Sequence, residues 1–560
     1  MCGIVGYAGN IETACGKPLE VCLQGLERLE YRGYDSAGVA LTAPGMDKVV
    51  VRKKAGRLKN LVEDIERKPM PLATVGIGHT RWATNGEPSD VNAHPHTSMD
   101  GKVAIIHNGI IENASQLRLD LQAEGYRFAS ATDTEVAAKL LGKIVDKIIA
   151  DEGKPDLFKA VRRMARMLEG AFTILATDCR QPDIVVGARH DSPLVVGLGE
   201  GENFLGSDVA AFVAYTKRAM EVDQDQAVCV SADKVIVADF NGNVVENPKT
   251  YTVDWDASAA EKGGWDSFMD KEIHEDPAAV QRTLLGRFDT NGDITLDEVR
   301  IDEHDFKAID KIIVVACGTA SYAGQAAKYA IEHWVRIPVE IELAHEFRYR
   351  DPILTPRTLV VAISQSGETM DTLMALRHAR EQGSKVLAIC NTQGASIPRE
   401  SDAVLYTHAG PEVAVASTKA FVAQITAAYL LGLYLAQVKG AMFRDEVHQM
   451  LDSLKDMPRK IQWVLDTQPK TIQAAAERMV NANSFLFLGR HVGYPVALEG
   501  ALKLKEIAYT FTEGFAAGEL KHGPIALVDE GEPVVFIVPP QRGRNVLHAK
   551  VISGIEEVKA

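Results

Sequence analysis

The pattern of hydrophobic residues changes character near residue 311, and this change predicts two different folds in one chain. Before it, short β-type runs at residues 103–106, 172–175 and 235–237 are separated by only a few amphipathic helices. This pattern is typical of an α+β fold in which two β-sheets pack together and helices cover their outer faces. After it, strands, glycine turns and helices alternate, which indicates parallel sheets of the doubly wound type.

The alternating pattern occurs twice, so we expect two α/β lobes with parallel sheets that arose by an internal duplication. The first begins with Lys311–Ala316, and a similar, shorter pattern returns at residues 485–489. A chain of 560 residues also exceeds a single hydrophobic core. We therefore predict a first domain over residues 1–240, a linker and helical segment over 241–300, a first lobe over 301–455 and a second, incomplete lobe over 456–560.

Composition narrows the classes of function. The formal net charge of -15 argues against nucleic acid as the main partner. The seven cysteines form no CxxC pair and no Cys/His metal spacing, so we expect a cytoplasmic protein without a metal site. The first residues lack the features of a signal peptide. Residues 420–438 are almost uniformly apolar, and we interpret them as a helix buried in a core or a subunit interface, not a membrane span.

Residues 289–298 imitate a calcium-binding loop, but neither register supplies the required ligands. In one register Arg287 stands where the first carboxylate belongs. In the other, Ile294 replaces the glycine and Arg300 replaces the bidentate glutamate. We expect a polar turn here.

Cys2 stands directly behind the initiator methionine, at the head of an apolar strand. Removal of Met1 would place a thiol and a free α-amine on one residue. The amine has an unperturbed pKa of about 7.7–8.0, so it could act as general base for its own thiol. A buried structural cysteine is the alternative, and Cys2 alone does not decide between them.

Three further motifs suit the chemistry of an amino-acid amide. Asn108 and Gly109 follow a hydrophobic strand, where an amide side chain and a backbone N–H can face a developing oxyanion. Arg81 could grip an α-carboxylate, and Asp133 could hold an α-ammonium group. Each motif also has an ordinary structural interpretation, as a turn, a surface charge or a helix cap.

Together with residues 31–38 and 92–96, these motifs resemble the glutamine amidotransferases that use an N-terminal cysteine nucleophile. The resemblance implies an N-terminal-nucleophile sandwich fold for the first domain. It implies Cys2 as nucleophile and an oxyanion hole made by Asn108 and Gly109. Asn85 stands where this family usually has histidine, so we expect a changed contact there. The glutamine-binding residues implied by the resemblance are Arg81, Trp82, Thr84 and Asp133.

The loop at residues 364–369, Ser-Gln-Ser-Gly-Glu-Thr, lies between a buried strand and a helix. Hydroxyls and backbone N–H groups at a helix N-terminus suit a phosphate monoester. The lysine of a nucleotide-binding P-loop is absent, so ATP is not the expected ligand. A helix cap is the alternative interpretation.

A charged stripe made by Glu499, Lys503 and Glu506 runs along the otherwise apolar helix after Pro495. At spacings of i, i+4 and i+7 these residues share one face, and a solvent-facing Glu–Lys ladder is the ordinary explanation. A carboxylate held in place by a neighbouring cation could instead move a proton during a sugar isomerisation.

The phosphate loop and the motif at residues 415–420 resemble sugar isomerase (SIS) domains, and the whole chain resembles the glutamine-dependent fructose-6-phosphate aminotransferases. This family makes glucosamine 6-phosphate and glutamate without a metal or organic cofactor. The resemblance implies that Glu506 is the base that moves the sugar proton and that Lys503 is the cation beside it. It also implies that His522 opens the sugar ring and comes from the neighbouring subunit of a homodimer. Trp82 would gate the passage of ammonia. The sugar-phosphate ligands implied by the resemblance are Thr319, Ser364, Gln365, Ser366, Thr369 and Ser417.

Two departures from this resemblance stand out. Ala320 replaces a serine found in several members of the family. Nothing after Pro540 matches the lysine-bearing tail of the family, so we expect either an incomplete sequence or a shortened form whose synthase activity is uncertain. The alternatives are therefore a form that only hydrolyses glutamine, a sugar-phosphate-binding sensor, or a deglycase. The last class lacks an amidotransferase half.

Overall fold

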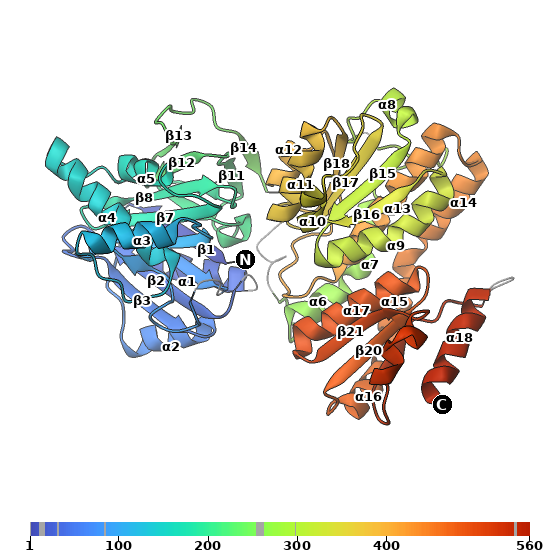
Figure 1. The fold of residues 1–560 in the computed structure, drawn as a ribbon. Helices are drawn as coiled ribbons and strands as arrows, with labels where there is room; N and C mark the ends of the chain where they lie inside the picture. The colour runs from blue at the N-terminus through green and yellow to red at the C-terminus, as the bar shows by residue number, and fades with distance from the viewer. Residues whose placement is uncertain are drawn as a thin grey trace. The chain divides into compact units, whose positions relative to one another are not determined.

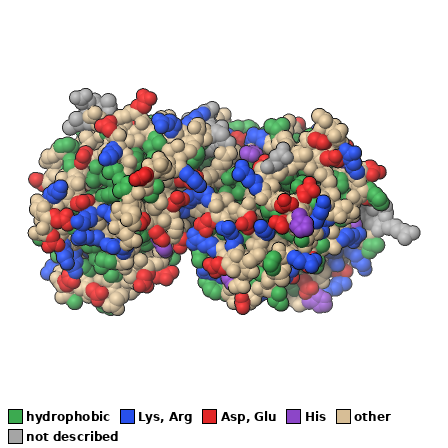
Figure 2. Space-filling model, turned by 90° about the horizontal axis from the view of Figure 1, so that it is seen from above, with side chains coloured by type: hydrophobic (Ala, Val, Ile, Leu, Met, Phe, Trp, Pro, Cys, Tyr) green, Lys and Arg blue, Asp and Glu red, His purple; other side chains and the backbone are tan. Residues whose placement is uncertain are grey.

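The computed structural model describes residues 2–10, 17–30, 33–82, 86–253, 262–296, 298–541 and 546–560. Two residues of interest, Thr84 and Asn85, lie outside this part of the chain. The chain divides into two compact units, Met1–Glu261 and Lys262–Ala560 (Figure 1). Acidic and basic side chains are interspersed over the face shown in Figure 2.

The first unit contains two antiparallel sheets, as the sequence predicts. The strands of the eight-stranded sheet are, in order, β14 (Thr250–Thr252), β11 (Arg218–Glu221), β9 (Val195–Leu198), β10 (Glu202–Gly206), β1 (Gly3–Gly9), β4 (Val75–Arg81), β2 (Ser36–Thr42) and β3 (Val50–Ala55). Those of the six-stranded sheet are β13 (Val235–Asp239), β12 (Gln226–Val230), β8 (Gln181–His190), β7 (Phe172–Asp178), β6 (Val103–Gly109) and β5 (His96–Thr97).

Apolar side chains bury both faces of each sheet. Ile4 and Ile77 of the larger sheet pack against Ile106 and Leu175 of the smaller one. Helices α1 (Lys17–Leu29) and α2 (Leu58–Arg67) cover the outer face of the larger sheet. Helices α4 (Asp133–Glu152) and α5 (Leu157–Ala165) cover the smaller sheet, and α3 (Ala114–Ala123) packs beside α4. A short helical turn, η2, spans Val209–Ala211. The predicted sandwich is confirmed.

The second unit begins with a lobe built on five parallel strands. Their order is β16 (Val339–Leu343), β15 (Lys311–Ala316), β17 (Thr358–Ser364), β18 (Lys385–Cys390) and β19 (Ala403–Tyr406). One face packs against α9 (Gly318–Val335) and α13 (Lys419–Lys439). The other packs against α10 (Ala344–Arg350), α11 (Met370–Glu381) and α12 (Ser396–Glu400). The remaining helices of this part are α6 (Phe268–His274), α7 (Asp276–Leu284), α8 (Glu303–Ala308) and α14 (Arg444–Lys455).

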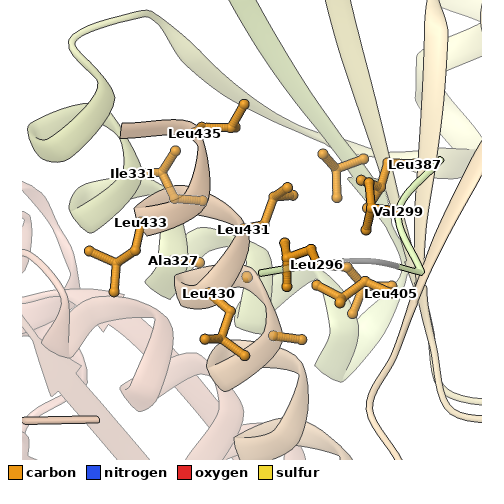
Figure 3. Close-up of a cluster of buried hydrophobic side chains, with 14 of the residues drawn as sticks. Leu296, Val299, Ala327, Ile331, Leu387, Leu405, Leu430, Leu431, Leu433 and Leu435 are labelled. Carbon is orange, nitrogen blue, oxygen red and sulfur yellow. The ribbon is translucent and has the colours of Figure 1, made fainter. Parts of the chain in front are cut away.

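Helix α13 is the apolar segment singled out in the sequence. It is the one helix in the described chain that is long and apolar enough to cross a bilayer, yet most of its apolar window is buried inside the protein. Leu430, Leu431 and Leu433 pack with Ile331 of α9 and with Leu405 of β19 (Figure 3). The interpretation as a buried helix is confirmed.

A second, smaller lobe completes the unit. Its parallel strands are β21 (Phe511–Ala516), β20 (Ser484–Gly489) and β22 (Val534–Phe536). Helix α17 (Gly493–Ala508) packs on this sheet and against α9 of the first lobe. The other elements are α15 (Met457–Thr467), α16 (Pro469–Met479), α18 (Val546–Lys559) and the short turns η4 (Leu520–His522) and η5 (Pro524–Leu527).

Residues 289–293 form a polar turn. The Asp289 carboxylate accepts the backbone N–H groups of Asn291 and Asp293 at 2.8 and 2.9 Å. Arg287 is buried and pairs with Glu298. Among the described residues, no group of three or more His, Cys, Asp or Glu side chains is arranged to hold a metal ion.

Candidate active site

Cys2 lies at the junction of two neighbouring strands. It directly precedes β1, which pairs with β4, and Trp82 directly follows β4. The backbone N–H of Trp82 donates to the Cys2 sulfur at 3.2 Å, and the thiol faces the Trp82 carbonyl oxygen at 3.6 Å. Burial raises the pKa of the Cys2 thiol, while the Trp82 backbone and the Arg81 charge oppose that rise. The thiol therefore needs a base to become a nucleophile, and a donor already faces its sulfur.

Asn108 and Gly109 end strand β6 and lie beside Cys2. The Asn108 side chain donates from Nδ2 to the Cys2 carbonyl oxygen at 2.7 Å. Gly109 has a φ of +121°, and a Cβ at this position would lie 2.0 Å from the Ala171 carbonyl oxygen. Only glycine fits here, because both the backbone conformation and the close approach exclude a side chain. The pair is therefore a strand end fixed against Cys2, not a turn.

Arg81 is not a surface charge, and Asp133 is not a helix cap, although the sequence allows both interpretations. Arg81 is the last residue of β4, is almost fully buried, and donates to the Gly86 carbonyl oxygen at 3.0 Å. Burial lowers its pKa, and the charges of Cys2 and Asp133 oppose that change. Helix α4 is capped by Thr132, so Asp133 is not the cap. Its carboxylate accepts the backbone N–H of Ile111 at 3.0 Å.

Four buried histidines surround this site, and no role was predicted for any of them from the sequence. His79 contacts both the Asn108 side chain and the His107 backbone. The His79 and His94 rings lie 4.2 Å apart, and those of His94 and His96 lie 5.3 Å apart. Burial lowers the pKa of all four side chains. The only sign of them in the sequence was that these histidines lie within or beside the motifs that carry the resemblance.

In the second unit, the loop at residues 364–369 joins β17 to α11. Thr369 holds the N-cap position, but its hydroxyl caps no helical N–H. It contacts the Ser364 hydroxyl at 3.1 Å, and Ser364 accepts the Gly367 N–H at 3.0 Å. Ser366 accepts the N–H of Glu368 at 3.2 Å, and the Gln365 carbonyl accepts that of Asn391. Hydroxyls and backbone N–H groups thus gather at the start of α11 without forming a helix cap.

The charged stripe of α17 is turned toward α9, and it is partly exposed only at its Glu506 end. Glu499 is almost fully buried, and Thr319 of α9 donates to it at 3.1 Å. Lys503 donates to Thr319 at 3.1 Å and to Glu506 at 2.6 Å. Burial raises the pKa of Glu499 to about 7, while Lys503 and Thr319 oppose the rise. The solvent-facing ladder is therefore wrong, because the stripe packs against the helix of the other lobe.

The remaining predicted residues lie in loops. Ser417 lies just before α13, and its hydroxyl is buried without a hydrogen-bond partner in the described chain. His522 is exposed in the turn η4, and among the described residues it makes no hydrogen bond or ion pair with the α17 stripe. Ala320 packs against the core of the first lobe. The structure therefore joins Thr319, Lys503 and Glu506 by hydrogen bonds, and His522 takes no part in them among the described residues.

Two carboxylates that no sequence motif singles out hold the Ser417 loop. Glu272 of α6 accepts the backbone N–H groups of Val413 and Ala414 at 2.6 and 3.0 Å. Glu412 accepts those of Thr418 and Ala420 at 3.0 and 3.1 Å. Burial raises the pKa of Glu272 to about 7. Their signal in the sequence was weak, because isolated glutamates in polar surroundings usually face solvent.

Known families match both units. Residues 79–214 match the glutamine amidotransferase domain family. Residues 306–434 and 478–556 both match the SIS domain family, which supports the predicted duplication.

Curated relatives match the full chain. It is 63% identical over 561 residues to the glutamine–fructose-6-phosphate aminotransferase (isomerizing) of Corynebacterium efficiens, covering 100% of this chain and 89% of the relative. The chain belongs to the glutamine–fructose-6-phosphate aminotransferase family. Aminotransferases of the same name from Streptomyces coelicolor and Mycobacterium tuberculosis are 58% and 54% identical, also over 100% of this chain and 89% of each relative.

A solved structure supports the fold of the second unit in this aminotransferase family. It is the C-terminal domain of glucosamine-fructose-6-phosphate aminotransferase from Francisella tularensis. The likeness covers 53% of this chain and 82% of that one, with 40% sequence identity and a TM-score of 0.51.

Proposed function

We propose that this chain uses glutamine to aminate fructose 6-phosphate, forming glucosamine 6-phosphate and glutamate. This reaction is the first step of hexosamine and UDP-N-acetylglucosamine synthesis. The observation that carries the proposal is the pairing of Cys2 with Asn108, whose Nδ2 lies 2.7 Å from the Cys2 carbonyl oxygen. This pairing places a nucleophile and an oxyanion donor side by side, in a chain of the aminotransferase family.

In the first half-reaction, the Cys2 thiolate attacks the side-chain carbonyl carbon of glutamine, and a carbon–sulfur bond forms. The negative charge on the carbonyl oxygen is met by Asn108 Nδ2 and the Gly109 N–H. The α-amine that Met1 removal would free takes the thiol proton and passes it to the leaving ammonia. Water then cleaves the thioester to give glutamate. Arg81 binds the α-carboxylate and Asp133 the α-ammonium, while Trp82 and Thr84 complete the glutamine site.

In the second half-reaction, the sugar phosphate occupies the second unit. The phosphate binds the hydroxyls and N–H groups of the loop at residues 364–369, which contains Ser364, Gln365, Ser366 and Thr369. Ammonia condenses with the C2 carbonyl of the open sugar to form an imine, and the carbonyl oxygen leaves as water. Glu506 then moves a proton from C1 to C2, with Lys503 as its cation. Thr319 and Ser417 line the sugar.

The arrangement of the whole protein is also part of the proposal. His522 opens the sugar ring from the neighbouring subunit, so the chain acts as a homodimer through its SIS domains. The exposure of His522 on η4 supports a role toward another chain. We further propose a cytoplasmic enzyme that uses no metal and no organic cofactor. The domain boundaries at residues 240, 300 and 455 stay predictions.

The decisive test compares Cys2→Ala with the unchanged chain. Intact mass should first show the loss of Met1. Glutamate release from glutamine should then fall to background in Cys2→Ala, because no other group replaces the sulfur nucleophile. Cys229→Ala is the matched control, since Cys229 is also a partly buried free thiol of the first unit, on β12. It should keep full glutaminase activity.

Amino-sugar formation is measured in the same assay after addition of fructose 6-phosphate. Synthesis that disappears in Cys2→Ala with glutamine but persists with ammonia salts supports two coupled half-reactions. Glutamate release that survives in Cys2→Ala contradicts the proposal. Glutamate release without any amino sugar, at all fructose 6-phosphate concentrations, would show that the chain only hydrolyses glutamine. It would contradict the proposed second half-reaction.

A further inference from the structure

We propose that His79 is a positioning residue for glutamine hydrolysis, which fixes the Asn108 side-chain amide with its nitrogen toward Cys2. His79 lies on β4, two residues before Arg81, and its side chain is fully buried. Its Nε2 lies 3.0 Å from Asn108 Oδ1 and 3.0 Å from the His107 carbonyl oxygen. The inference rests on the proposed glutamine hydrolysis.

The hydrogen-bond partners determine the tautomer of His79. The His107 backbone carbonyl oxygen can only accept a hydrogen bond, so Nε2, which faces it, carries the proton. The other ring nitrogen, Nδ1, is buried and has no hydrogen-bond partner in the described part of the chain. Burial lowers the pKa of His79 to about 3, so the ring is neutral at working pH and keeps this one donor.

The fixed donor in turn determines which way the Asn108 amide points. Its Oδ1 accepts from His79, and its Nδ2 donates to the Cys2 carbonyl oxygen at 2.7 Å. A rotated amide would place its NH₂ group against the Nε2 proton, so two donors would face each other without an acceptor. One hydrogen of Nδ2 is used by Cys2, and the second is the one that can meet an oxyanion.

Neighbouring rings hold the plane of the imidazole. His94 packs on His79 with ring centres 4.2 Å apart and an angle of 32° between the planes. His96 packs edge-on against His94 and contacts the Thr132 hydroxyl at 3.0 Å. Burial lowers the pKa of both residues well below the usual range, so neither adds a charge that would compete with the oxyanion site.

The test replaces the donor and keeps the ring. His79→Phe should lower kcat for glutamine hydrolysis by about 10²-fold, the size of effect seen when one oxyanion donor is lost. KM for glutamine should change little, since Arg81 and Asp133 bind the other end of the substrate. His79→Gln can place an amide N–H near the position of Nε2, and it should recover kcat to within about tenfold of the unchanged protein.

A double-mutant cycle separates this role from a general structural one. If His79 acts through Asn108, His79→Phe combined with Asn108→Ala should be no slower than Asn108→Ala alone. Multiplied losses in the double variant would overturn the proposal. So would a folded His79→Gln, with an unchanged melting temperature, that is as slow as His79→Phe.

Two controls keep the outcomes distinct. The rate of Cys2 alkylation by iodoacetamide shows whether the nucleophile is still in place, and melting temperatures show whether each variant folds. If the unchanged chain hydrolyses no glutamine, the proposed function fails. If it does and the His79 variants match its kcat, only the role of His79 fails.

Discussion

The two candidate sites differ in the secondary structure that holds their residues in place. In the first unit, His79, Arg81 and Asn108 lie on strands of two sheets and are almost fully buried. In the second, the charged stripe lies on α17, which packs on a three-stranded sheet, and the helices α15 and α16 of the same unit have no fully buried side chain. The glutamine site is thus held by the backbone of its own unit, whereas the sugar site depends on side-chain contacts between two lobes.

The largest effect that tests this comparison is expected at Glu506. Glu506→Gln should lower amino-sugar formation by about 10²- to 10⁴-fold, because the base that moves the sugar proton is lost. Glutamine hydrolysis without sugar should stay unchanged, since the glutamine site is complete within the first unit. The measurements are amino-sugar and glutamate release in parallel assays.

Glu513→Gln is the matched control for this variant, because Glu513 is exposed on β21 of the same lobe. It should keep both activities. An equal loss of both activities in Glu506→Gln would show that the two sites are not separately supported.

A backbone change should break the glutamine site. Gly109→Ala places a Cβ 2.0 Å from the Ala171 carbonyl oxygen at a φ of +121°. We expect glutamate release to fall by about 10²-fold and the free energy of unfolding to fall by about 2 kcal/mol, because neither strand can move aside. Kinetics and calorimetry measure the two effects.

Gly125→Ala serves as the reference for Gly109→Ala. Gly125 has a φ of +93°, but nothing lies within 4 Å of a Cβ there. Gly125→Ala should lower the free energy of unfolding by about 1 kcal/mol, because of the backbone conformation alone, and leave glutamate release unchanged. Similar activities in the two alanine variants would mean that the strand end does not shape the oxyanion site.

The last effect is on stability alone, and it concerns the pH dependence of the second unit. Burial raises the pKa of Glu272 from 4.5 to about 7, so its contribution to stability is full below pH 4.5 and is lost as pH rises through about 7. Glu272→Gln keeps an oxygen for the N–H groups of Val413 and Ala414. It should flatten the decline in melting temperature between pH 5 and 8, by an amount that corresponds to about 3 kcal/mol at most.

Asp276 adds to this decline, because burial raises its pKa to about 7 as well. Some slope will therefore remain in Glu272→Gln. Glu477→Gln, on the exposed face of α16, should leave the slope as it was. A Glu272→Gln slope identical to that of the unchanged protein would show that Glu272 is ionised in the folded protein.

Local pattern predicted the elements of this fold well. The strands at residues 103–106 and 172–175 are paired neighbours in one sheet, and the buried character of α13 follows from its composition. The order of the strands in the two antiparallel sheets could not be read from the sequence, because it depends on contacts between distant segments. β1, for example, pairs with β10 and β4.

In the candidate sites, too, the residues could be predicted from the sequence, but the contacts between distant segments could not. Resemblance singled out Cys2 and Asn108, and the structure places them in contact. The face that α17 presents was ambiguous, since helical spacing says which residues share a face but not what covers it. His79 escaped notice for a related reason. Its importance comes from two acceptors on another strand, and no spacing along β4 records them.

The contact between Thr319 and Glu499 also bears on the history of the chain. Each belongs to the helix that follows the first strand of one SIS repeat, α9 after β15 and α17 after β20. Equivalent helices in two copies of one ancestral module therefore meet with different chemistry, a hydroxyl on one side and acids with a lysine on the other. Under the proposed function, deletion of either SIS module would remove one partner of this contact and with it part of the sugar site.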